Sequence, residues 1–192
     1  MRRTKLFALM ITAAMCLGLC ACSSGENDRK KFDSFRQELL LAQRISCRAV
    51  ITANFGSSVS EFEVEMEHSG NESRITVLSP ESIAGISARI SQDSARLEFD
   101  GLVLDMGELT EDGLTPVEAL PQMVTALTDG FVEYIWREAE DEKEYITVEI
   151  TINDTADLQI WMDAGTMYPV YAQLRSDGNT IINCEFSQWT VE

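Results

Sequence analysis

The sequence predicts a mainly β domain of the α+β class: one strongly curved antiparallel sheet of about eleven strands, with an N-terminal helix and a short internal helix. After residue 46 apolar and polar residues mostly alternate with a period of two, as Phe62, Val64 and Met66 do within the glutamate-rich run 61–67. Short turn-like segments separate such runs, so nearly all the strands can join as consecutive hairpins. A sheet with one apolar face must curl or be covered, because a flat open sheet would leave that face in water.

The chain begins with a segment typical of a secretory signal. Three basic residues precede the apolar stretch 6–21, which is too short for a bilayer core that needs about 20 residues. The stretch ends in Leu19-Cys20-Ala21-Cys22 and is followed by small and polar residues. This pattern resembles the bacterial lipobox, which implies a diacylglyceryl group on Cys22 and removal of residues 1–21. Ordinary signal cleavage without lipidation is the alternative.

The resemblance to a lipobox implies an exported, lipid-anchored protein on the extracytoplasmic face of the cell membrane. Removal of 1–21 takes away three basic and no acidic residues, so the net charge changes from −17 to −20. Anionic lipid heads would repel such a domain, so the anchor must be covalent. Residues 22–30 are expected to form a polar tether, and 31–192 the folded domain.

Two helices and the strands follow in order. An amphipathic helix is predicted within 29–45, because its apolar residues recur at spacings of three and four. The internal helix should start at Thr115 and Pro116 and stop at Gly130. After a first strand that includes Cys47, strands are expected at 61–67, 74–78, 85–91, 95–100, 102–106, 131–137, 144–152, 157–163, 169–176 and 180–189.

Composition argues against several functions. A net charge of −17 argues against nucleic acid as a partner, since phosphate binding needs a basic surface. His68 is the single histidine and should be exposed, which leaves little basis for a metal site or histidine catalysis. No nucleophile elbow or phosphate-binding loop occurs, and the acidic pairs are typical of solvated strand faces and turns. We therefore expect no enzyme, cofactor or metal.

Two cysteines, Cys47 and Cys184, remain after the signal and the lipidated residue are set aside. Counting in twos places both on the apolar side of their strands. A disulfide between them would close a long loop and stabilise the fold by roughly 4–5 kcal/mol. Two separate buried thiols are the alternative, and the sequence leaves both open.

The apolar residues of the strands are the feature most relevant to function. A half-open sheet lined by flexible Met and aromatic side chains suits an acyl chain, although many such residues are simply core. The candidate residues of the concave face are Phe55, Phe62, Met66, Ile86, Ile90, Leu97, Phe99, Trp136, Ile150 and Met162.

A family resemblance rests on this arrangement of lipobox, leading helix and about eleven strands, and on three short segments: 80–85 (Pro-Glu-Ser-Ile-Ala-Gly), 161–163 (Trp-Met-Asp) and 168–170 (Tyr-Pro-Val). The sequence resembles the LolA/LolB-like lipoprotein-carrier superfamily over about 31–189, especially Gram-positive-type membrane lipoproteins of GerS-like architecture. The resemblance implies an unclosed β-barrel whose hydrophobic concavity is covered by helices and binds acyl chains.

Two hypotheses of function follow. In the first, the protein is a membrane-anchored lipoprotein that binds a hydrophobic ligand, a lipid or a lipidated polypeptide, in its concave face. In the second, it is an accessory lipoprotein with a filled cavity that binds an envelope or spore-cortex protein.

Overall fold

The computed structural model describes residues 23–54, 56, 58–91, 94–107 and 115–192. The predicted signal, Cys22 and the candidate Phe55 lie outside these residues.

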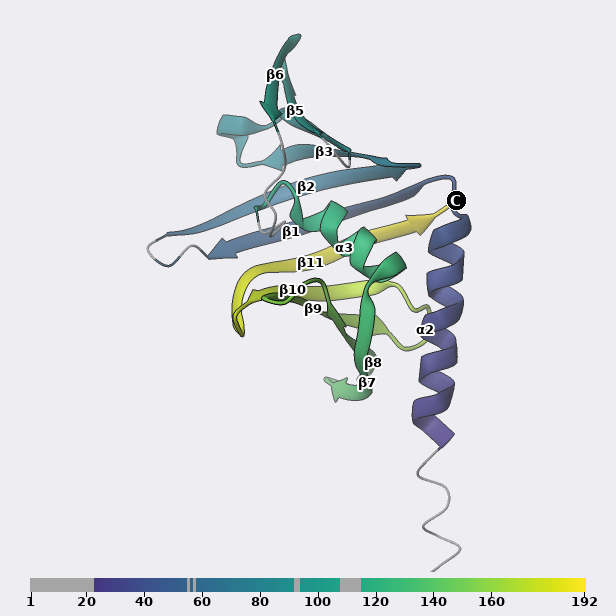
Figure 1. Cartoon of the computed structure of the whole chain (residues 1–192). Coiled ribbons are helices and arrows are strands. Elements are labelled where there is room, and N and C mark those ends of the chain that lie inside the picture. Colours follow the sequence, from purple (N-terminus) through teal and green to yellow (C-terminus); the bar gives the residue numbers. More distant parts are fainter. Residues whose placement is uncertain (1–22, 55, 57, 92–93, 108–114) are drawn as a thin grey trace, which may run out of the picture.

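The described strands form one antiparallel sheet of eleven strands in the order β6-β5-β4-β3-β2-β1-β11-β10-β9-β8-β7. Two meanders therefore meet where β1 pairs with β11. No described pairing joins β6 to β7, so the sheet curls without closing, and the predicted fold class is confirmed (Figure 1). The strands are β1 (Ile45–Asn54), β2 (Val59–Ser69), β3 (Glu72–Ser79), β4 (Ser87–Ser91), β5 (Ser94–Phe99), β6 (Leu102–Gly107), β7 (Phe131–Glu140), β8 (Lys143–Thr151), β9 (Ala156–Asp163), β10 (Pro169–Ser176) and β11 (Asn179–Val191).

Two α-helices cover part of this sheet. Helix α3 (Ala119–Asp129) crosses the middle of the sheet, and helix α2 (Ser23–Leu41) runs along one end of the strands (Figure 1). A short 3₁₀ turn, η1 (Glu81–Ile83), precedes β4. None of the described helices is both long and apolar enough to cross a membrane.

The first α-helix differs from its prediction. It begins at Ser23, so the stretch predicted as a polar tether is helical, and it ends at Leu41 because Ile45 already starts β1. Serine, glycine and asparagine at 23–27 are poor helix formers, which is why composition indicated a tether. Tertiary contacts hold this part of the helix, as described below.

The second α-helix starts after a turn at 115–118 and stops where predicted. Its last turn packs so closely that a Cβ on Gly130 would lie 2.4 Å from Cγ2 of Ile150 and 2.6 Å from the carbonyl oxygen of Ala126. Only glycine fits at this position, and the backbone can therefore turn directly from α3 into β7.

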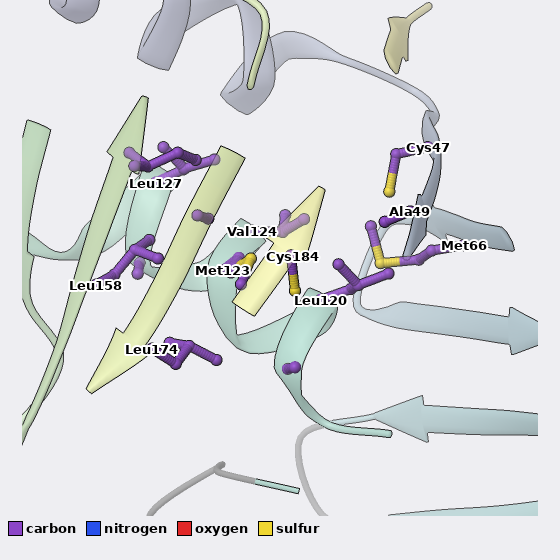
Figure 2. Close-up of a cluster of buried hydrophobic side chains, with 14 of the residues drawn as sticks. Cys47, Ala49, Met66, Leu120, Met123, Val124, Leu127, Leu158, Leu174 and Cys184 are labelled. Atoms are coloured by element: carbon purple, nitrogen blue, oxygen red, sulfur yellow. The ribbon is translucent and has the colours of Figure 1, made fainter. Parts of the chain in front are cut away.

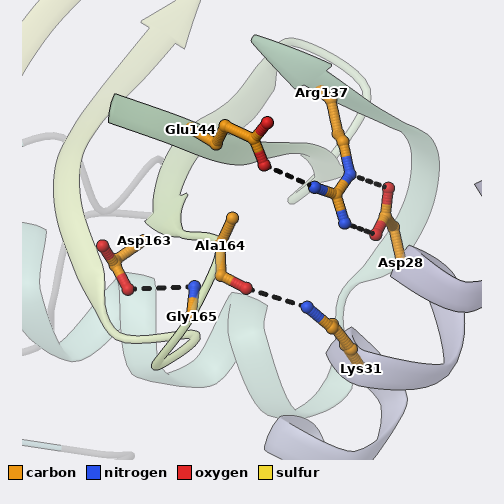
Figure 3. A network of polar contacts seen from close by, with 7 residues as sticks. All are labelled: Asp28, Lys31, Arg137, Glu144, Asp163, Ala164 and Gly165. Carbon is orange, nitrogen blue, oxygen red and sulfur yellow. Dashed lines mark hydrogen bonds and ion pairs between the residues drawn. The ribbon is translucent and has the colours of Figure 1, made fainter. Parts of the chain in front are cut away.

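A polar network holds α2 against the sheet (Figure 3). Arg137 on β7 donates to both carboxylate oxygens of Asp28, over 2.8 and 2.7 Å, and to Glu144 over 2.9 Å. Lys31 Nζ donates to the carbonyl oxygen of Ala164 over 2.8 Å. The Asp28 side chain is only 3% exposed, so this bidentate pair anchors the first turns of α2.

A second contact ties α2 to α3. Arg36 Nε donates to the carbonyl oxygen of Leu127 over 2.7 Å, and its Nη2 donates to that of Gly130 over 3.0 Å. These carbonyls belong to the end of α3, where helical partners are absent and a positive charge is favourable. Helix α2 therefore fixes the position of α3 over the sheet.

Candidate ligand-binding face

The register of the strands defines an inner, concave face. Directly paired residues point to the same side of a sheet, so one row runs from Cys47 on β1 through Met66, Ile75, Ala88 and Leu97 to Leu104 on β6. The inner face therefore extends continuously from the centre of the sheet to its β6 edge.

Helix α3 fills the central part of this face. Leu120, Met123 and Leu127 are at most 1% exposed, and Figure 2 shows them among inner-face side chains of β1, β2, β9, β10 and β11. Four of the predicted ligand-binding residues are buried in this core: Met66, Ile90, Ile150 and Met162. A ligand could reach Met66, Ile150 and Met162 only if α3 moved, whereas Ile90 also lines the pocket described below.

The β3–β6 part of the sheet, which we call the wing, is covered only in part: Ile75 and Ile90 on β3 and β4 belong to the buried core, whereas most of the β5–β6 hairpin is exposed. Phe99 and Leu102 are paired on the inner face of the β5–β6 hairpin, and both are more than half exposed. Leu104 is 62% exposed there, and Met106, at a bulge near the end of β6, is 55% exposed. The outer face of the hairpin carries Arg96, Glu98, Val103 and Asp105. The hairpin is thus amphipathic, and its apolar side is open.

Three predicted residues lie in or beside this open region: Phe99 is exposed, and Ile86 and Leu97 are half-buried. Phe62 on β2 is half-buried and packs against the core. The Phe99 ring lies over Gly85, since a Cβ on that glycine would be 4.0 Å from ring atom Cε2. Gly85 has a φ of +87°, which favours glycine, and the open backbone leaves room for the ring.

One predicted residue is on the wrong face. Trp136 is paired with Thr147, which puts it on the outer face, where its indole N–H and that of Trp161 both donate to the carboxylate of Glu138. The cause is a β-bulge between Val132 and Tyr134, which reverses the alternation for the rest of β7. Simple counting in twos cannot detect such a bulge.

The prediction also omitted residues that the structure places on the open face. These residues are Leu102 and Leu104, which the sequence places in a predicted strand without marking them as lining. Their signal is present in the sequence, because they alternate with residues of the opposite face, and they pair with the predicted Phe99 and Leu97.

A separate pocket of about 500 Å³ lies between the end of α2, α3 and the β2–β3 hairpin. Its lining mixes apolar residues such as Leu39 and Ile90 with polar ones such as Gln122 and Asp129. His68, predicted to be exposed, is half-buried here, and its Nδ1 lies 2.8 Å from Ser73 Oγ. Burial lowers the pKa of His68 below its ordinary 6.5. Within the described residues no group of three acidic, His or Cys side chains could hold a metal.

The two cysteines are buried free thiols, so the disulfide alternative is wrong. Both lie on the inner face, as predicted, but Cys184 is paired with Ile51 and Cys47 with Trp189. The four-residue offset between Cys47 and Ile51 corresponds to about 13 Å along β1. A disulfide requires Cα atoms within about 7 Å, so the register itself prevents the bond.

Comparison with known proteins defines the class of fold. No protein-family model matches the sequence, and no curated protein matches it. The crystal structure of a DUF1329 family protein from Desulfovibrio piger is similar, with a TM-score of 0.52 and 12% identity over 84% of this chain and 91% of that one. An uncharacterized conserved protein from Thermus thermophilus gives 0.50 and 10%, covering 85% of this chain and 87% of its own.

A LolA superfamily protein from Nitrosomonas europaea is similar at a lower TM-score of 0.44, with 10% identity over 83% of this chain and 93% of that one. Identities this low concern the fold alone. The chain shares its fold with the structures at TM-scores of 0.52 and 0.50. It is an unclosed antiparallel sheet with helices over its concave side, the architecture that the sequence resemblance implied.

Proposed function

We propose that the protein is a non-enzymatic, membrane-tethered lipoprotein of the cell envelope that binds an acyl chain, from a lipid or a lipidated polypeptide, on the inner face of the wing. One observation carries the proposal. The inner side of the β5–β6 hairpin exposes large apolar residues in a row that continues into the core.

The chemistry of this face suits an acyl chain. Phe99, Leu102 and Leu104 present apolar surface without an intervening charge, because alternation turns the charged residues to the outer face, and the exposed Met106 lies at the bulge at the end of β6. Full burial of one such side chain contributes about 1.5–3 kcal/mol. A flexible methionine also adapts to ligands of different shape.

The proposed anchor gives this face a defined orientation. Helix α2 begins one residue after Cys22, and Figure 1 shows its first turn at the end of the molecule opposite the β5–β6 hairpin. A lipid on Cys22 would therefore hold the wing away from the membrane. We infer that the wing receives its ligand from the side facing away from the anchoring membrane.

Fatty-acid binding tests the proposal with a matched pair of variants. Leu104 and Val103 are 62% and 64% exposed on opposite faces of one strand. With a fluorescent fatty acid, Leu104→Ser should weaken binding about tenfold or more, whereas Val103→Ser should leave it unchanged. Absence of binding by the unmodified protein, or equal effects of the two variants, would refute an acyl site on the inner face of the wing.

Lipidation is tested separately. We expect the full chain, expressed in a bacterium, to incorporate radiolabelled palmitate and to fractionate with membranes, whereas Cys22→Ala should do neither. Cys20→Ala, which leaves Cys22 in place, is the control. Palmitate incorporation that persists in Cys22→Ala would disprove this anchor.

A second candidate function is that of a protein-binding accessory lipoprotein. The filling of the central concavity by α3 favours it, because Leu120, Met123 and Leu127 occupy space that an acyl chain would need. This function predicts no fatty-acid binding but a stoichiometric complex with an envelope or spore-cortex protein. Native mass spectrometry of the purified protein distinguishes the two by the mass of what it carries.

A further inference from the structure

The two edges of the sheet differ in how they are protected. Edge strands present unpaired backbone N–H and C=O groups, and proteins usually protect such edges with charges, bulges or proline. Strand β7 has four charged residues and the bulge between Val132 and Tyr134. Strand β6 also has a bulge, at Met106 near its end, but it has no proline or basic residue, and Asp105 is its one charged residue.

No other described strand pairs with the outer side of β6, which pairs with β5 alone and ends the strand order of the sheet. Its large apolar side chains are exposed on both faces: Leu102 and Leu104 on the inner face and Val103 on the outer, with Met106 exposed at the bulge. A strand with this pattern is a template for another strand.

We propose that β6 adds an extended segment of a partner protein to the sheet through backbone hydrogen bonds. The segment would place apolar side chains at alternate positions, beside Leu102 and Leu104 in the regular part of β6, before the bulge at Met106. Its remaining side chains would be basic or neutral, because the chain carries a net charge of −17 and would repel an acidic segment.

The occupant is a different protein rather than a second copy. Antiparallel pairing of two β6 strands about a twofold axis would direct the two molecules away from each other. Figure 1 places the start of α2 at the end opposite β6, so the two α2 helices would begin at opposite ends of such a dimer. Two chains anchored by Cys22 could not then lie in one membrane, and their like net charges would also repel.

The inference goes beyond acyl binding, since it concerns the backbone edge and a polypeptide. The test uses residues 23–192, which contain both α-helices, every strand and the whole described core. The probe is a fluorescent peptide of four Lys-Val repeats, measured by anisotropy in moderate salt. Two further peptides carry N-methyl groups on every valine or on every lysine, which removes donors along one edge of the strand and leaves its side-chain charges in place.

We expect the unmodified peptide to bind and at least one methylated peptide to bind tenfold more weakly. Leu104→Lys should weaken binding similarly, and Tyr134→Lys, at an equally exposed position (62%) on the β7 edge, should not. Circular dichroism checks that each variant is folded. No peptide binding, or equal binding of all three peptides, would overturn the proposal, as would a concentration-dependent dimer that Leu104→Lys abolishes. Fatty-acid binding without peptide binding would overturn this inference alone, whereas loss of fatty-acid binding with retained peptide binding would overturn only the acyl site.

Discussion

The covered part of the sheet (β1 and β8–β11) and the β5–β6 hairpin have the same alternation of apolar and polar residues, but their inner faces differ in exposure. On β1 and β8–β11 the inner residues are almost all fully buried, because α2 and α3 lie over them. On β5 and β6 the inner residues are equally apolar, yet Phe99 and Leu104 are more than half exposed. A period of two therefore specifies which side of a strand is apolar, whereas the position of the helices decides whether that side becomes core or surface.

This contrast separates stability from binding. The covered part contains the helices, the polar network around Asp28 and the fully buried side chains. The outer part of the wing, the β5–β6 hairpin, exposes most of its apolar side chains and is held mainly by its backbone ladder. Regions with few buried contacts open at lower free energy than the rest of a protein. Substitutions in the two parts should accordingly have different effects.

The largest difference is expected for truncated leucines. Leu127→Ala should reduce the free energy of unfolding by about 2–5 kcal/mol, since the side chain is fully buried and its removal leaves a cavity. Leu104→Ala should cost less than about 0.5 kcal/mol, because this side chain is mostly in water already. Urea denaturation measures both, and equal losses would contradict the division into a covered part and an open wing.

The next effect concerns ion pairs in the two parts. Arg137→Met leaves the buried carboxylate of Asp28 without its partner, which should cost about 2 kcal/mol, less than a fully buried pair because Arg137 is partly exposed. The double variant Asp28→Asn/Arg137→Met should recover much of this loss. Arg89→Met is the control in the wing: it removes exposed pairs with Glu72 and Glu98 and should leave the denaturation midpoint almost unchanged. Similar losses for Arg137 and Arg89 would show that the network does not hold α2.

Much of the fold could be predicted because strands carry their pattern locally. Alternation of apolar and polar residues predicts the strands, and Gly130 predicts the end of α3. Both signals lie within a few residues of the sequence. The helical start of α2 could not be predicted, because it depends on the contact of Asp28 with Arg137, which lies more than a hundred positions away in the sequence.

The candidate site was predicted only in part. Leu97 and Phe99 lie in or beside the open inner face. Trp136 lies on the outer face, because the bulge between Val132 and Tyr134 reverses the alternation in the rest of β7. Whether Met66 is core or lining depends on where α3 lies, which no local pattern contains.

A smaller effect is expected from pH at the turn between β9 and β10. The backbone N–H of Thr166 lowers the pKa of Asp163 below 3.8, helped by the Thr166 hydroxyl and the Gly165 N–H and opposed by burial. The unfolded state then binds more protons near this pH, so the contribution of Asp163 to stability is present above about 3.8 and is lost as the pH falls through the folded value.

Asp163→Asn should therefore cost about 1 kcal/mol at pH 7, and the difference from the unmodified protein should be smaller at pH 3. Asp100→Asn in the β5–β6 turn is the matched control. Asp100 has a φ of +47°, a conformation that asparagine also tolerates, so this variant should behave like the unmodified protein at both values. Urea denaturation at pH 7 and pH 3 checks both, and a loss that is independent of pH would disprove the charge-based explanation.

The smallest effect, no change at all, is expected from reductant. Cys47 and Cys184 are free and out of register, so a reducing agent should not shift the melting temperature. Burial raises the pKa of Cys47 to about 12 and also raises that of Cys184, which keeps both thiols protonated and unreactive near neutral pH. Iodoacetamide should therefore modify neither until the protein unfolds, whereas a cysteine introduced as Leu104→Cys should react within the folded protein. If the native cysteines reacted as fast as the introduced one, the covered part would have to open as readily as the wing, and the distinction between core and binding face would fail.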